Sequence, residues 1–588
     1  MIPVDKNPLY ALLDGTSLIE ASAGTGKTYT ITGLYVRLLL EEDLPVSRIL
    51  VVTFTRAATE ELKDRIRARI SQTLKDFQAN SSKDRFTRSL LQTCDHDRSI
   101  ALLRRALAEF DLSSIHTIHG FCQRVLAENA FLCNAPFDAQ VLPDQEETIM
   151  QIVRDFWRRR ILALPETFLN HLLDDGLSPE SLYDQIRAGL NHPLIRVLPK
   201  NQMEGTADME REFSALFQRA REIWESASGE ITAILLHSPD LKRNIFRIKT
   251  TQNRIDSLHS LFTTTPTVNK CLGLQCFTNS HIVYGTKKGC PVPEHPFFPI
   301  AEELFTLAAR MKETYSRNKA VLQSKLLKTV RLELAREREK DNSMGYEDML
   351  TRVYRALTLP HADRLIRAVQ AMYSAALIDE FQDTDPLQFE IFRILFGSRP
   401  QILFLIGDPK QSIYSFRGAD VFAYFAAARD CRTRLTLDTN YRSRPGLLKA
   451  VNALFSHRSN LPFGMKEITY TDVLPSPEME EKSGAQPSLN FWYLEGDDKG
   501  KLNKPAARKL AAQAVAARIG KLIREQGTRA GDCAVLVRKN LEARLMRDEL
   551  SRLAIPGVVY AAGSVFHTPE AEDLYLLFTA AADPSRVQ

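Results

Sequence analysis

"LIEASAGTGKTYTI" spans residues 18–31. A short apolar run leads into small residues, and the next stretch, YTITGLYVRLLLEE (residues 29–42), has apolar side chains at helical spacing. A strand, a glycine-containing loop and a helix form the arrangement of a phosphate-binding loop, GxxxxGK[ST], here with Ala21 in place of the first glycine. The alternative is a loose glycine turn, and the rest of the chain decides between the two.

The small residues of this loop suit a polyphosphate. Gly24 and Gly26 allow backbone N–H groups to approach phosphate oxygens without an intervening Cβ. The helix N-terminus adds partial positive charge, Lys27 can reach the β- and γ-phosphates, and Thr28 can ligate Mg²⁺. The predicted nucleotide-binding residues are therefore Ala21, Ser22, Ala23, Gly24, Thr25, Gly26, Lys27 and Thr28.

Length and composition indicate a globular protein of several domains. The chain has 588 residues, of which 44% are hydrophobic and 25% charged, and its net charge of +5 permits nucleic acid as a partner. Its eight cysteines are scattered, which favours reduced thiols in the cytoplasm over a disulfide framework. The sequence shows no signal peptide and no run near the ~18 apolar residues of a membrane span, so no membrane partner is expected.

Alternating strand and helix patterns predict an α/β fold with a parallel sheet. The strand-like runs RILVVTFT, SAALIDE, QILFLIGD and RLTLDTN end in polar residues at positions 55, 380, 408 and 440. Between about residues 125 and 340 the pattern is amphipathic and predicts a large helical insertion. After a linker-like stretch past residue 450, a new α/β pattern begins, with expected strands at LNFWYLEG (489–496) and CAVLVR (533–538).

"LIDEFQDTDPLQ" (residues 377–388) places two carboxylates at the end of an apolar strand. Open parallel sheets bind ligands at this end. Asp379 can hold Mg²⁺, and Glu380 can orient or deprotonate an attacking water. A solvated acidic turn is the alternative interpretation, and it fits two carboxylates directly after a buried run poorly.

"LFLIGDPKQSIYSFRGAD" (residues 403–420) is a third exit from a strand into a loop. Gln411 has the chemistry to sense a γ-phosphate or its attacking water. Tyr414, Phe416 and Arg417 combine aromatic rings with a cation, which suits stacking on single-stranded nucleic acid, although aromatic residues are more often core.

Three further segments end strands or open loops with ring-bearing or cationic residues. In LDTNYRSRP, Tyr441 can stack on an adenine and Arg442 can meet a phosphate. In VVTFT (51–55), Phe54 can stack a base. In IHTIHGFCQR (115–124), a lone histidine is by default a partly buried residue, so His119 gains a role only through its neighbours.

Taken in order, these segments resemble the superfamily 1 helicases of the UvrD/Rep type. The set is AxxGTGKT, VVTFTxxAxxEL, TIHGFC, IDEFQDTDPxQ, GDPKQSIYxFRGAD and LDTNYRS. Within the family, LIEASAGTGKT, TIHGFCQR and LIGDPKQSIYSFRGADVFAY are more similar to the helicase subunits of RecBCD-type helicase–nucleases than to Rep, UvrD or AddA. The resemblance covers nearly the whole chain, with the helical insertion only loosely patterned.

The resemblance implies an ATP-dependent DNA helicase acting in recombinational repair at double-strand ends, with RecC-like and RecD-like partner subunits in a bacterial cytoplasm. It implies Mg²⁺ at Thr28 and Asp379, catalytic roles for Glu380, Gln411 and Arg442, and stacking of the nucleotide on Tyr441. It also implies a single-strand track lined by Phe54, Thr55, His119, Tyr414, Phe416 and Arg417.

In such helicases two RecA-like domains, 1A and 2A, carry helical insertions. Domain 1A is expected at 1–120 and 340–445, the insertion 1B at 121–339, and the start of an incomplete 2A at 446–588. Two departures from the family pattern matter: no glutamine precedes the loop to read adenine, and the later helicase motifs and a nuclease domain are not found by Gln588. A truncated chain that binds DNA or partners without hydrolysis, and a Rep-like or AddA-like translocase, are therefore the alternatives.

Overall fold

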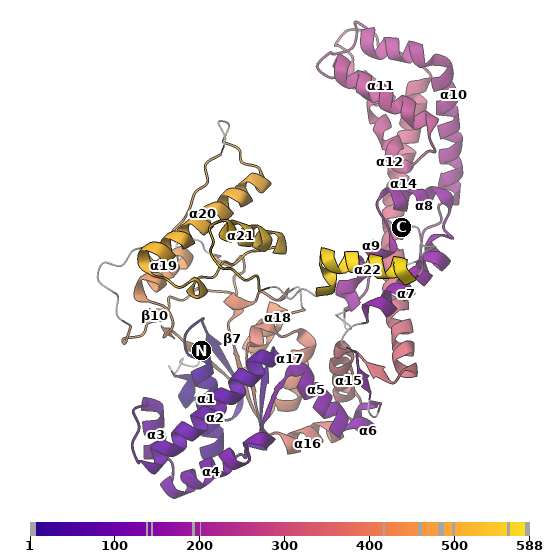
Figure 1. Cartoon of the computed structure of the whole chain (residues 1–588). Coiled ribbons are helices and arrows are strands. Elements are labelled where there is room, and N and C mark those ends of the chain that lie inside the picture. Colours follow the sequence, from indigo (N-terminus) through magenta and orange to yellow (C-terminus); the bar gives the residue numbers. More distant parts are fainter. Residues whose placement is uncertain are drawn as a thin grey trace. The chain divides into compact units, whose positions relative to one another are not determined.

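The apolar runs near the phosphate-loop motif form a six-stranded parallel sheet in the order β3-β2-β6-β7-β1-β8 (Figure 1). This confirms the predicted α/β class. The computed structural model describes residues 7–136, 139–142, 145–190, 195–199, 202–415, 418–456, 461–479, 487–496, 500–560 and 565–582. The strands are β1 (Gly15–Ala21), β2 (Ile49–Thr53), β3 (Ser114–Thr117), β6 (Ala375–Ile378), β7 (Ile402–Gly407) and β8 (Thr433–Leu437).

Both faces of the sheet are covered, which is why its central strands read as unbroken apolar runs. Successive β2 residues alternate between two cores: Ile49 and Val51 enter one, and Leu50 and Val52 enter the other. The first core is closed by α1 (Lys27–Leu40), α2 (Arg56–Gln78), α3 (Arg85–Thr93) and α4 (His96–Ala108). The second is closed by α5 (Ile118–Glu128), α6 (Ala130–Cys133), α15 (Tyr346–Thr358), α16 (Ala362–Met372), α17 (Pro386–Phe396) and α18 (Val421–Asp430).

The predicted helical stretch has a core of its own. Its buried side chains run from Val153 to Val330 and include a cluster of tilted and edge-on aromatic rings around Trp224, Phe262 and Phe297. The long α14 packs along α10, and the short parallel pair β4 (Gln140–Val141) and β5 (Ser343–Met344) joins the two ends of the stretch (Figure 1). The helices are α7 (Glu146–Phe156), α8 (Glu166–Asp174), α9 (Pro179–Leu190), α10 (Ala207–His237), α11 (Ile248–Thr263), α12 (Val268–Cys271), α13 (Asn279–Gly285) and α14 (Phe297–Lys340).

The chain divides into two compact units, residues 1–482 and 483–588. The first ends with α19 (Pro445–Ser456) and the two-stranded pair β9 (Thr439–Asn440) and β10 (Leu474–Pro475). The second contains α20 (Lys504–Gln526), α21 (Asn540–Arg552) and α22 (Pro569–Ala582), with a small core between α20 and α21. No helix within the described ranges is long and apolar enough to cross a membrane.

The prediction of two strands in the second unit is wrong. Residues 489–496 and 533–538 form no strand. Their apolar composition predicts a strand, but a strand is held by backbone hydrogen bonds to a neighbour, and no strand lies in the described part of this unit.

Candidate active site

The glycine-rich loop leaves β1 and enters α1 with backbone angles that only glycine adopts without strain. Gly24 and Gly26 have φ of +79° and +88°. A Cβ on Gly24 would lie 2.7 Å from Asn440 Nδ2 and 2.8 Å from Arg442 Cβ. Both glycines are therefore needed for the turn, and Gly24 is needed for close contact with the segment after β8.

Lys27, at the first position of α1, forms an ion pair with a carboxylate. Its Nζ is 2.6 Å from Glu380 Oε2, and the lysine side chain is only 15% exposed. Glu380 has φ of +51°, in the left-handed region that non-glycine residues rarely adopt. Strain of this kind persists where the surroundings impose it, and it concentrates at functional sites.

A chain of hydrogen bonds continues from Glu380, in the loop after β6, to the loop after β7. Gln382 Nε2 donates to Glu380 Oε2 at 2.7 Å, and Gln382 Oε1 accepts from the N–H of Asp408 at 2.9 Å. Gln411 Nε2 then donates to Asp408 Oδ2 at 2.8 Å. The loops after β1, β6 and β7 are thus joined in one polar network, in which Glu380, Gln382 and Asp408 link Lys27 to Gln411.

Buried carboxylates make this edge of the sheet electrostatically suited to a cation. Burial, together with the neighbouring charge of Glu380, raises the pKa of Asp379 from 3.8 to about 6, against the opposing effect of Lys27. The pKa of Asp383 is raised to about 6 for the same reasons. Asp383 Oδ1 is buried and has no hydrogen-bond partner among the described residues. Carboxylate and hydroxyl oxygens are the ligands that Mg²⁺ takes, so Asp379 and Thr28, in the first turn of α1, fit a magnesium ion chemically.

The segment after β8 closes over the loop. Asn440 Nδ2 donates to the carbonyl of Ala23 at 2.7 Å, and the N–H of Tyr441 donates to the carbonyl of Gly24 at 2.8 Å. The Asn440 side-chain oxygen also accepts the N–H of Arg442. These bonds leave the side chains of Tyr441 and Arg442 exposed beside the loop. Sequence reasoning missed Asn440, although it directly precedes a residue chosen for the site.

A second group of predicted residues gathers at the ends of β2 and β3. The rings of Phe54 and Tyr414 are tilted with centroids 5.5 Å apart. Phe54 and His119 line the same cavity of about 320 Å³, and His119 lies edge-on to Tyr346 at 5.4 Å. Burial lowers the pKa of His119. Its Nε2 is buried and has no hydrogen-bond partner in the described part of the chain.

Of the remaining predicted residues, three have structural roles and two lie outside the described part of the chain. Thr55 caps α2, because its hydroxyl accepts the N–H of Ala58 at 3.1 Å, which supplies a structural role of its own. Thr25 is buried and donates to the carbonyl of Ser22, so it holds the loop closed. Ala21 ends β1 and is fully buried. Phe416 and Arg417 lie outside the described residues.

All these groups follow the carboxyl ends of parallel strands and therefore share one edge of the sheet. In the order β3-β2-β6-β7-β1-β8, the ring-bearing group lies at β3 and β2 and the glycine-rich loop at β1. The loop after β7 serves both groups: it bears Gln411 in the polar network and, three residues later, Tyr414 against Phe54.

Comparison with known proteins gives matches along nearly the whole chain. The model of the UvrD/REP helicase N-terminal domain matches residues 4–432, and that of the UvrD-like helicase C-terminal domain matches residues 435–585. The chain is 34% identical to the RecBCD enzyme subunit RecB of Escherichia coli (strain K12), over 99% of this chain and 51% of that protein. It is 31% identical to the same subunit of Haemophilus influenzae (97% and 51%) and 25% identical to that of Mycolicibacterium smegmatis (97% and 42%). The chain thus spans about half the length of the curated relatives it matches.

Proposed function

Because the chain belongs to the UvrD/Rep helicase family, with the RecA-like α/β fold of that family, we propose that it is the ATP-driven motor region of a DNA helicase. The observation that carries the proposal is the loop after β7. In this loop, Gln411 belongs to the polar network that reaches Lys27, and Tyr414 contacts the ring of Phe54. A change at the nucleotide therefore has a short covalent route to the residues proposed to hold DNA.

In the proposed reaction, the backbone N–H groups of the glycine-rich loop and Lys27 bind the triphosphate. Lys27 exchanges its ion pair with Glu380 for the phosphate oxygens, and this exchange frees the Glu380 carboxylate to orient the attacking water. Mg²⁺, held by Thr28 and Asp379, would neutralise phosphate charge. Gln411 and Arg442 face the γ-phosphate, and Tyr441 packs on the base.

The proposed single-strand track uses Phe54, Thr55, His119 and Tyr414, with Phe416 and Arg417 from the same loop. Aromatic rings stack on bases of any sequence, which suits a protein that moves along DNA. The neutral, half-buried His119 can donate or accept a hydrogen bond from its unpartnered nitrogen.

The more specific assignment is to a RecBCD-type enzyme. The relatives' printed name makes each of them a subunit of a RecBCD enzyme, and we carry this to the chain as a proposal: action at double-strand ends in recombinational repair, in a bacterial cytoplasm, with RecC-like and RecD-like subunits. Residues 1–120 and 340–445 would be domain 1A, 121–339 the insertion 1B, and 446–588 part of 2A.

Nucleotide binding by the Lys27→Ala variant tests the proposal. Titration calorimetry with ATP and Mg²⁺ is expected to show binding to the wild-type chain and at least tenfold weaker binding to the variant, because the lysine is the main cation aimed at the triphosphate. Lys75→Ala, an exposed lysine of the last turn of α2, is the matched control and should bind as the wild type does. Equal binding by Lys27→Ala and the wild type would contradict the proposal.

A further inference from the structure

Lys410, in the loop after β7, is a largely buried cation that the proposed reaction does not use. Its Nζ lies 2.8 Å from Glu20 Oε1 and 2.9 Å from Asp408 Oδ1. The exposure of the side chains falls from 36% at Glu20 through 10% at Lys410 to 2% at Asp408. Lysine is seldom buried unless it is paired, and here the pairing brings positive charge inward to a carboxylate that water scarcely reaches.

Asp408 divides its two carboxylate oxygens between two neighbours. Oδ1 accepts the N–H of Lys410, at 3.0 Å, and also contacts the Lys410 ammonium. Oδ2 accepts a hydrogen bond from Gln411 Nε2 at 2.8 Å. Because the carboxylate is planar, a rotation that turns Oδ2 away from Gln411 also turns Oδ1 away from Lys410. The ion pair therefore restrains the acceptor that the Gln411 amide binds.

The charge of Asp408 also decides which end of the Gln411 amide faces it. A carboxylate accepts hydrogen bonds and donates none, so it selects Nε2 of Gln411 and turns Oε1 elsewhere. A protonated Asp408 would present a donor as well as an acceptor and would lose this selection. Burial favours the protonated form, whereas a neighbouring ammonium favours the charged form. Lys410 thus acts on the Gln411 amide through Asp408.

Glu20 supports the charge of Lys410 from the more exposed side. Burial lowers the pKa of Lys410, but the charges and hydrogen bonds of Glu20 and Asp408 outweigh burial and raise it, so the ammonium stays charged. Glu20 is the last residue but one of β1, and in the sheet it pairs with Gly407, the last residue of β7. The ion pair therefore ties the strand that leads into the glycine-rich loop to the loop that carries Gln411.

We propose that Lys410 and Glu20 are positioning residues for Gln411. Lys410 fixes the carboxylate that orients the amide, and Glu20 fixes Lys410. The inference rests on the proposed nucleotide site, in which Gln411 faces the γ-phosphate. An amide that is already oriented loses little freedom when the γ-phosphate arrives, so the pair favours a nucleoside triphosphate over a diphosphate. A diphosphate lacks the group that Gln411 faces, so its binding should not depend on the pair.

The experiment measures the dissociation constants of ADP and of β,γ-imido-ATP, both with Mg²⁺, by titration calorimetry on the full chain. Their ratio is the preference for the triphosphate. Lys410→Met should lower this ratio about three- to tenfold, a part of what a hydrogen bond to a charged group contributes, and leave ADP binding unchanged. Lys410→Arg, which keeps the cation, should retain most of the preference. Glu20→Gln should lower the ratio by a smaller factor than Lys410→Met.

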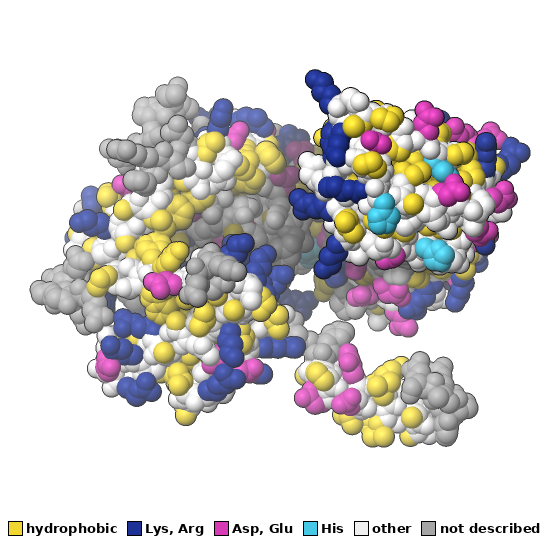
Figure 2. Space-filling view, turned by 90° about the horizontal axis from the view of Figure 1, so that it is seen from above, with side chains coloured by type: hydrophobic (Ala, Val, Ile, Leu, Met, Phe, Trp, Pro, Cys, Tyr) yellow, Lys and Arg dark blue, Asp and Glu magenta, His cyan; other side chains and the backbone are white. Residues whose placement is uncertain are grey.

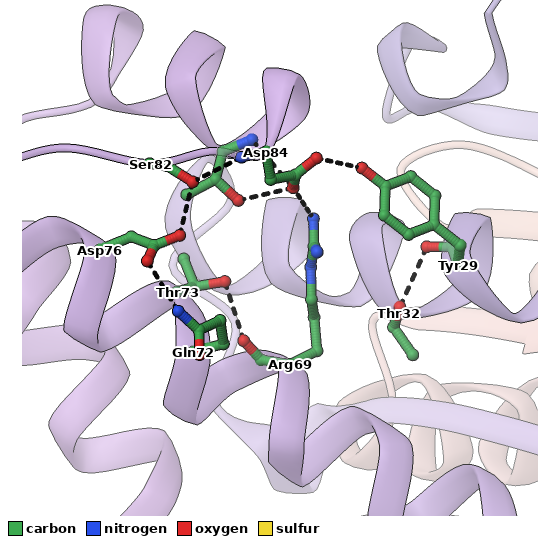
Figure 3. A network of polar contacts seen from close by, with 9 residues as sticks. Tyr29, Thr32, Arg69, Gln72, Thr73, Asp76, Ser82 and Asp84 are labelled. Carbon is green, nitrogen blue, oxygen red and sulfur yellow. Dashed lines mark hydrogen bonds and ion pairs between the residues drawn. The ribbon is translucent and has the colours of Figure 1, made fainter. Parts of the chain in front are cut away.

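A double variant and a matched control separate positioning from general support. Because Lys410 acts through the amide, Lys410→Met should add nothing to the loss of preference caused by Gln411→Ala. The control is Arg69→Met, which removes another partly buried ion pair of the same unit, that of Arg69 with Asp84. The network around that pair joins α1, α2 and the segment before α3, and Figure 3 shows in it none of the residues that bind Asp408. The control should keep the wild-type ratio.

Three outcomes overturn the inference: equal weakening of both nucleotides by Lys410→Met, an unchanged ratio, or additive losses in the double variant. If Lys410→Met does not fold, Glu20→Gln decides instead, because Glu20 is partly exposed and its loss leaves the inner pair intact; an unchanged ratio then overturns the inference. If Gln411→Ala keeps the wild-type ratio although Lys27→Ala weakens both nucleotides, the γ-phosphate role of Gln411 has failed and the inference falls with it. If wild type binds neither nucleotide, or Lys27→Ala weakens neither, the proposed nucleotide site itself has failed.

Discussion

Two apolar stretches have similar composition, ILVVT at 49–53 and CAVLV at 533–537, but they differ in burial. The first is β2, fully buried between β3 and β6. In the second, Leu536 is 96% exposed, and hydrophobic side chains lie at the surface over α20 and α21 (Figure 2). Composition alone therefore does not decide burial, because a strand also needs neighbours that pair with its backbone and helices that cover its faces.

The polar groups of the two units differ in the same way. At the sheet edge, burial raises the pKa of Asp379, Asp383 and Glu347. In the second unit, the pKa of Glu542 is lowered, chiefly by a hydrogen bond from the backbone of Arg538. The charged forms of these buried carboxyl groups are thus disfavoured, whereas the charged form of Glu542 is favoured by its neighbours.

The largest effect is expected at Glu380. Glu380→Gln removes the proposed water-orienting carboxylate, so single-turnover ATP hydrolysis with single-stranded DNA should fall at least about a hundredfold. ATP binding should be equal or tighter, because Lys27 no longer has a carboxylate partner to leave. Measurements of radiolabelled phosphate release and of ATP affinity separate the two effects. A parallel loss of affinity would mean that the Lys27–Glu380 pair only organises the loop.

A smaller effect, on stability, is expected at Glu347 in the first turn of α15. Burial, followed by the charges of Asp385 and Asp348, raises its pKa from 4.5 to about 7. The folded state thus binds this proton more tightly than the unfolded state, and the resulting stability is present below pH 4.5 and is lost as the pH rises through about 7. Glu347→Gln keeps the shape without the charge.

Between pH 5 and pH 8.5, the free energy of unfolding of the variant should rise relative to that of the wild type by about 2 kcal/mol. Each tenfold difference in proton affinity between the folded and unfolded chains is worth ~1.4 kcal/mol, and the full value is reduced because the side chain is partly exposed. Denaturant unfolding at several pH values measures this difference. Glu337→Gln, on the exposed surface of α14, is the control and should show no such trend. A pH-independent difference for Glu347→Gln would show that the carboxyl is already solvated in the folded chain.

The sequence predicted the sheet well because its strands are covered on both faces and each ends in polar residues. It also predicted which loops meet at the edge, and the roles assigned to Glu380 and Gln411 stay predictions. It missed Asn440, because its contact joins segments that only folding brings together: Asn440 reaches Ala23 across 417 positions. The strands expected in the second unit were wrong because apolar composition does not reveal whether a pairing partner is present.

The smallest effect is expected at Leu536, and it tests the contrast between residues 49–53 and residues 533–537. Truncating a side chain that is already 96% exposed removes almost no buried surface, so Leu536→Ala should change the free energy of unfolding by no more than about 0.5 kcal/mol. Leu50→Ala, in fully buried β2, leaves a cavity and should cost roughly 2–5 kcal/mol. Hydrogen–deuterium exchange by segment reports on each unit separately. A loss of protection in residues 500–560 on Leu536→Ala would mean that this stretch is buried in solution and that the two regions are more alike than their surroundings indicate.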